Sequence, residues 1–89
     1  MNEREKDRRA KCRVSINKEK CEVLGFAECT EEVYALLREK GLHIETPANI
    51  GAQQQLFTIR VNYCEDLPAI QATIDAWVSG ESYSAANDT

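Results

Sequence analysis

The sequence predicts one small domain of the α/β (α+β) class, an antiparallel sheet covered on one face by two helices. Three observations lead to this fold. The chain has 89 residues, which suits a single domain, and its 43% of apolar residues can fill one core. Two segments carry apolar residues at helical spacing, and other segments alternate apolar and polar residues as strands do. We expect the domain over residues 11–80, with a flexible charged arm over 1–10 and a tail or short edge strand over 81–89.

The N-terminal half of the domain begins with a strand. Apolar and polar residues alternate over 12–16, which is typical of a half-buried strand, and the polar residues 17–20 follow as a turn. Residues 22–28 leave two alternatives open, a short strand or an early start of the next helix. Gly25 opposes the helix, because glycine costs about 1 kcal/mol relative to alanine inside one.

Two helices have clear boundary signals. The first is predicted from near Thr30, a good N-cap residue, to Lys40, with Gly41 just beyond its end. The second is predicted over residues 66–79 and is closed by Gly80.

The remaining segments are predicted as strands and a loop. Residues 42–46 alternate and form a strand that Pro47 ends, 48–55 form a loop, and 56–63 form the best strand in the chain. The resulting order of strand, helix, strand, strand and helix is that of a ferredoxin-like sandwich.

Charge is distributed unevenly along the chain. The net charge is −4, but residues 1–20 carry +4 and the rest of the chain carries −8. An acidic body argues against nucleic acid as a partner, because phosphate contacts dominate that affinity. No segment reaches the ~20 apolar residues that span a bilayer, so no membrane partner is expected. The N-terminus is too charged for a signal peptide, and we expect a cytoplasmic location with cysteines kept as thiols.

The residues that could carry chemistry do not assemble into a catalytic or metal site. The cysteines contain no C-x-x-C pair, so we predict packing or free thiols and no structural zinc; these residues are Cys12, Cys21, Cys29 and Cys64. A reactive thiol at Cys29 or Cys64, each just before a helix, is the alternative. The single histidine, His43, lies on the polar face of its strand. No glycine-rich phosphate loop is present, so we expect no enzyme activity and no cofactor.

The middle of the chain resembles a known family. The sequence ALLREKGLHIE over residues 35–45 is similar to the helix-to-strand junction of ACT domains, where a helix ends in glycine and leads into a strand with Ile-Glu. The strand over 56–61 and the Glu65-Asp66 entry to the last helix continue the likeness. It covers residues 35–78 and is greatest to the ACT units of aspartokinases.

The resemblance implies a regulatory binding module. ACT domains usually pair side by side and bind amino acids or similar effectors at their interface. It therefore implies a non-catalytic homodimer that binds an effector of amino-acid class across the dimer interface. The positions that match the family's ligand contacts are Asn17, His43, Ile44, Glu45, Gln54 and Gln55. Gln54 and Gln55 stand where the family has a Ser-Glu pair, and the Pro-Gly that opens the family's first helix is absent.

The alternative is a small acidic protein-interaction module, which could derive from a mobile element. Such a domain would inhibit or adapt a larger protein partner and would bind it by charge. Its acidic surface would be formed by Glu22, Glu28, Glu31, Glu32 and Glu39. Loss of partner binding at high salt would distinguish it from the effector module.

Overall fold

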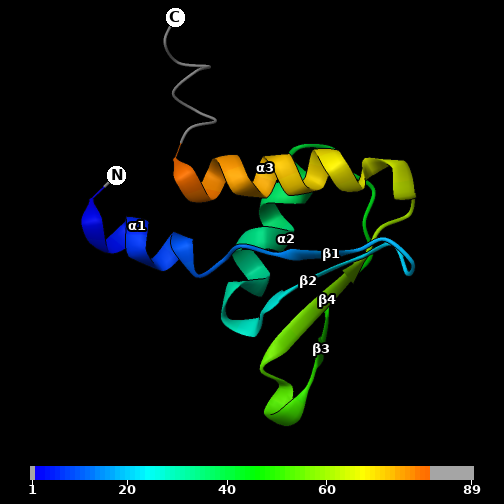
Figure 1. The fold of residues 1–89 in the computed structure, drawn as a ribbon, viewed down its shortest axis with the longest axis horizontal. Coiled ribbons are helices and arrows are strands. Elements are labelled where there is room, and N and C mark those ends of the chain that lie inside the picture. The colour runs from blue at the N-terminus through cyan, green and yellow to red at the C-terminus, as the bar shows by residue number, and fades with distance from the viewer. Residues whose placement is uncertain (1, 81–89) are drawn as a thin grey trace, which may run out of the picture.

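The computed structural model describes residues 2–80 and confirms a mixed fold with an antiparallel sheet (Figure 1). In chain order the elements are α1 (Glu3–Ala10), β1 (Ser15–Asn17), β2 (Glu22–Phe26), α2 (Thr30–Glu39), β3 (Ala48–Ile50), β4 (Leu56–Arg60) and α3 (Leu67–Ser79). Short 3-10 turns precede α2, β4 and α3. The tail or edge strand predicted for residues 81–89 lies outside the described residues.

The sheet consists of two hairpins joined through their inner strands. Its strand order is β1-β2-β4-β3, and every neighbouring pair is antiparallel. β2 and β4 pair over five residues, with Val23 opposite Ile59. The open alternative for residues 22–28 is therefore resolved as a strand over 22–26, followed by the 3-10 turn before α2.

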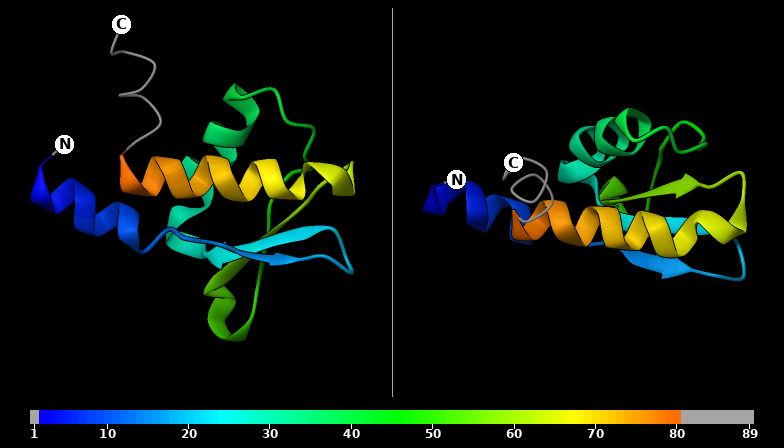
Figure 2. Two further views of the ribbon diagram at one scale, coloured as in Figure 1. Left: turned by 45° about the horizontal axis from the view of Figure 1, so that its top comes forward. Right: turned by 90° about the horizontal axis from the view of Figure 1, so that it is seen from above.

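One face of the sheet carries the core. The central strands contribute Val23, Phe57 and Ile59, all fully buried, and α2 and α3 pack against them. Figure 2 shows both helices on the same side of the sheet. The helix residues in this cluster are Val33, Leu36, Leu37, Leu67, Ile70, Ile74, Trp77 and Val78.

The two predicted helices are confirmed by α2 and α3. Thr30 opens α2 as its first residue and does not cap it, since its hydroxyl donates to the Ala27 carbonyl. Both helices end at a glycine with positive φ, +80° at Gly41 and +75° at Gly80, as the C-terminal signals predict.

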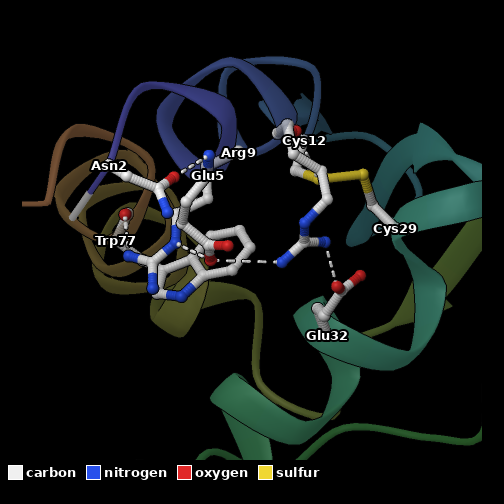
Figure 3. Close-up of polar contacts among 8 residues, drawn as sticks. Asn2, Glu5, Arg9, Cys12, Cys29, Glu32 and Trp77 are labelled. Atoms are coloured by element: carbon white, nitrogen blue, oxygen red, sulfur yellow. Dashed lines mark hydrogen bonds and ion pairs between the residues drawn. A yellow bond between two sulfur atoms is a disulfide. The ribbon is translucent and has the colours of Figure 1, made fainter.

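Residues 3–10 of the predicted flexible charged arm form a helix, α1, which was not predicted from the sequence. The helix has no apolar stripe, so periodicity could not reveal it. It is instead capped and docked: the Asn2 side chain accepts from the Glu5 backbone N–H at 2.8 Å, and Arg9 donates to the Trp77 carbonyl oxygen at 3.0 Å (Figure 3). The Arg9 guanidinium also lies 4.8 Å from the centre of the Trp77 ring, and α1 lies beside α3 (Figure 2).

The edge strand beside β4 lies later in the chain than predicted. The strand expected over 42–46 forms only one bridge, between Ile44 and Val61. The strand is instead β3, inside the segment 48–55 that was predicted as a loop. All three β3 residues are exposed, so they show no alternation that would reveal a strand.

The first and last predicted strands are present but shorter. The strand expected over 12–16 is β1, which covers only Ser15–Asn17, and the strand expected over 56–63 ends at Arg60.

The prediction that the cysteines are thiols is also wrong. Cys12 bonds to Cys29 and Cys21 bonds to Cys64, with Cα atoms 5.6 Å and 5.2 Å apart. Cys12 and Cys29 are 1% and 2% exposed, so we call their bond the buried disulfide, and that of Cys21 and Cys64 the surface disulfide. Disulfides persist in oxidising compartments, which removes the argument for cytoplasmic thiols and for a reactive free cysteine.

Candidate functional site

No element among residues 2–80 covers the face of the sheet opposite the core, which we call the open face and which carries rows of side chains. Because successive residues of a strand point to opposite faces, the residues between the core positions share this face. The strand register arranges them in rows across the sheet. The apolar row is Phe26, Leu56 and Ile50, and the middle row is Ser15, Leu24, Thr58 and Ala48.

The third row is charged. Asn17 lies opposite Glu22, and Glu22 lies opposite Arg60. On the other side of Arg60 lies Glu45, whose backbone N–H donates to the Arg60 carbonyl oxygen at 2.9 Å. We call these four residues the charged row. Residues directly opposite in a sheet have Cβ atoms about 5 Å apart, so the Arg60 Cβ atom lies between those of Glu22 and Glu45.

A shallow hollow of about 670 Å³ lies at this end of the sheet. The charged row supplies its floor through Glu22, Arg60 and Glu45, the β1–β2 turn supplies Lys20, and the surface disulfide forms part of its wall. Its full lining is Glu19, Lys20, Cys21, Glu22, Glu45, Arg60, Val61, Asn62 and Cys64. Cationic and anionic groups therefore face one small space, which suits a ligand that carries both charges.

Two of the six predicted ligand residues lie in the charged row, and of these Glu45 lines the hollow whereas Asn17 does not. Asn17 and Glu45 stand at the two ends of the charged row and are both exposed. Ile44 is buried in the core at 8% exposure, so its side chain faces away from the row.

The other three predicted residues lie elsewhere. His43 is exposed and contacts Tyr63 edge to face, with ring centres 5.5 Å apart. Gln54 and Gln55 precede β4 at Leu56, whereas Arg60 stands at its other end.

Sequence reasoning missed Lys20 and Arg60 as site residues, and it placed Glu22 in the acidic docking surface rather than beside Arg60. Their signal is the strand register, which places Glu22 beside Arg60 although the two are far apart in the chain. That register follows only once residues 22–26 are known to be a strand.

The proposed acidic surface is divided in the structure. Glu28, Glu31 and Glu32 line a second hollow of about 610 Å³ at the start of α2, and Glu32 is paired with Arg8 of α1. Glu22 instead belongs to the charged row on the sheet.

Within residues 2–80, no three His, Cys, Asp or Glu side chains are grouped so as to hold a metal ion. None of the helices over this part of the chain is both long and apolar enough to cross a bilayer. Comparison of the chain with protein-family models, with curated proteins and with solved structures finds no significant match.

Proposed function

We propose that the chain is a non-catalytic, ACT-like binding module whose charged row binds a small zwitterion of the amino-acid class. The observation that carries this proposal is the position of Arg60 between Glu22 and Glu45, at the floor of a hollow that Lys20 also lines. The α-carboxylate of an amino acid would pair with the Arg60 guanidinium, a geometry that favours two parallel hydrogen bonds. The α-ammonium group would pair with a flanking carboxylate.

The order of elements supports a ferredoxin-like assignment. From β2 onwards the chain runs strand, helix, strand, strand and helix, which is the first five elements of the βαββαβ pattern. The sixth strand of that pattern has no counterpart after α3 within the described residues. β1 comes before the pattern and forms the sheet edge beside β2. We therefore assign the domain to a ferredoxin-like sandwich in which the additional edge strand precedes the pattern.

The test is a thermal-shift and calorimetric screen against the free amino acids. A ligand at about 100 times its dissociation constant adds about 2.7 kcal/mol, which raises the Tm of a domain this small by roughly 10 °C or more. Arg60→Met keeps the aliphatic stem but removes the guanidinium, and Glu45→Gln removes one carboxylate. Each should weaken binding at least ~10-fold, since a charge-assisted hydrogen bond contributes about 1.5–3 kcal/mol.

The matched control is Arg4→Met, which removes an exposed arginine of α1 outside the hollow. It should leave the affinity unchanged. A panel in which no amino acid raises the Tm would refute the proposal, as would full affinity in the Arg60 and Glu45 variants.

A second candidate function is docking of a basic protein segment at the start of α2. The observation that favours it is the gathering of Glu28, Glu31 and Glu32 around one hollow. Binding of a lysine-rich peptide should then fall steeply between low and high salt and should be lost in Glu28→Gln/Glu31→Gln. Peptide binding that is unchanged both by high salt and by the two glutamine substitutions would refute this candidate function.

A further inference from the structure

We propose that two copies of this chain associate through the open faces of their sheets, about a two-fold axis that runs parallel to β2 and β4 and between them. This interface is argued from the sheet register alone and does not depend on the proposed effector.

The open face carries the apolar surface that such an interface needs. Phe26 and Ile50 are 54% and 41% exposed, and the neighbouring Leu24 and Leu56 are half-buried without joining the core cluster. Among the described residues the exposed large hydrophobic side chains are these two and Tyr63, so two of the three lie on this face. An open sheet face that gathers exposed apolar side chains is typical of an interaction site.

The strand order determines which rows meet in such a pair. β2 and β4 are the two inner strands of the sheet, so the axis passes through its middle. A rotation of 180° about that axis places β2 of one copy over β4 of the other and keeps each row opposite the same row. Such an interface is isologous, with every contact made twice.

The charged row is complementary to itself under this rotation. Glu22 of one copy faces Arg60 of the second copy, and Asn17 faces Glu45. In the apolar row Phe26 faces Leu56. A two-fold axis across the strands would instead place the apolar row on the charged row, which would desolvate charges without partners. Charge complementarity therefore selects the axis along the strands and a second copy of this chain as the occupant.

The size of the face determines the strength expected. Two strands of five residues and two of three, spaced about 4.8 Å apart with about 3.3 Å per residue, give a strand area of roughly 250 Å². Stable complexes bury about 800 Å² per partner, so we expect a reversible dimer with a dissociation constant of ~1 μM or weaker. Aligned sheets cross at about 30°, which concentrates the contact on the centre of the face.

The experiment is a charge exchange read by sedimentation velocity, with the full chain at concentrations up to ~1 mM so that a weak dimer is populated. Glu22→Arg and Arg60→Glu should each be monomeric alone, because like charges then face each other across the axis. An equimolar mixture of the two variants should form a heterodimer, because the arginine introduced in one variant then faces the glutamate introduced in the other. A heterodimer supports the proposal, because a second chain cannot restore the Glu22–Arg60 proximity that each variant has lost within its own chain. A mixture that remains monomeric overturns the proposal.

An apolar variant and its control complete the test. Phe26→Asp should abolish the wild-type dimer, whereas Tyr63→Asp, at an exposed aromatic residue outside the strands, should leave it intact. Circular dichroism and Tm establish that each variant is folded. A wild-type chain that sediments as a monomer up to ~1 mM, or a dimer that survives Phe26→Asp, refutes the proposed face. No free amino acid is added in either measurement, so failure of the effector proposal does not affect the outcome.

Discussion

Replacement of Gly25 by alanine tests the packing between the sheet and its own core. Gly25 lies in β2 on the buried face, and a Cβ atom there would lie 2.8 Å and 2.9 Å from two ring carbons of Phe57 and 3.2 Å from Val14 Cγ1. Favourable carbon contacts are about 3.5–4.0 Å long, so the ring would have to move by roughly 0.7 Å or more. Phe57 is fully buried between the sheet and the helices, so it has no open space to enter.

The sign of the effect follows from two opposing magnitudes. Glycine to alanine at a compatible backbone position stabilises by about 0.4–1 kcal/mol through the unfolded chain. Overpacking of a filled core costs about 1–3 kcal/mol. We therefore expect a net loss of about 1–2 kcal/mol in the free energy of unfolding, measured by urea titration, and a fall in Tm of roughly 5–15 °C.

Two further variants separate overlap from backbone effects. Gly41→Ala adds a Cβ with nothing within 4 Å but at φ +80°, so it should cost about 1 kcal/mol from backbone strain alone. Phe57→Leu removes ring atoms beside Gly25, so Gly25→Ala should cost less in that background, with a coupling of at least ~0.5 kcal/mol in the double-mutant cycle. A stabilising Gly25→Ala, or a cycle without coupling, would refute the packing argument.

Four other predictions concern the disulfides and α1. Loop-closure entropy predicts that replacing both cysteines of the surface disulfide by alanine lowers the free energy of unfolding by about 4 kcal/mol, measured by urea titration. The same replacement at the buried disulfide should lower it by about 3 kcal/mol. A variant as stable as the wild type would contradict this. Under mild reductant, mass spectrometry of alkylated protein should find the surface disulfide opened first, and prior opening of the buried one would be inconsistent with its burial. Arg9→Ala should raise hydrogen exchange in α1 while the core amides stay protected, and the control Arg4→Ala should leave exchange in α1 unchanged. The Arg9 Nε–H donates to Glu5 Oε2 at 3.1 Å, and this hydrogen bond holds the pKa of Glu5 below its ordinary 4.5. The contribution of this contact should therefore be present above pH 4.5 and be lost as pH falls through the lowered value. Protection factors of the α1 amides that do not change below pH 4.5 would contradict it.

The elements that sequence predicts well are those with both a periodic stripe and an end signal. α2 and α3 combine apolar stripes with Gly41 and Gly80, and the buried alternation of β4 identifies that strand at once. α1 could not be predicted in this way, because its stability comes from an N-cap and from Arg9 at Trp77, 68 positions away. Such contacts depend on the tertiary structure and leave no local pattern.

The candidate site was only partly predictable, because it also depends on contacts between residues far apart in the chain. Asn17 and Glu45 follow from the family resemblance, but the resemblance does not include the pairing of β2 with β4 that places Glu22 and Arg60 between them. The cysteine pairs were missed because their spacings of 17 and 43 residues carry no local motif. Pairing of that kind is decided by which loops the fold brings together.

The two disulfides also change the covalent connectivity of the molecule. Their spans interleave, since Cys21 lies between Cys12 and Cys29 while Cys64 lies beyond them. A backbone cut in the exposed turn at Ala52–Gln54 would therefore leave the N-terminal and C-terminal pieces joined through the surface disulfide. The cut chain would migrate as one species until it is reduced, and both halves of the hollow would stay attached to each other. After such a cut the domain would consist of two chains that the Cys21–Cys64 disulfide holds together.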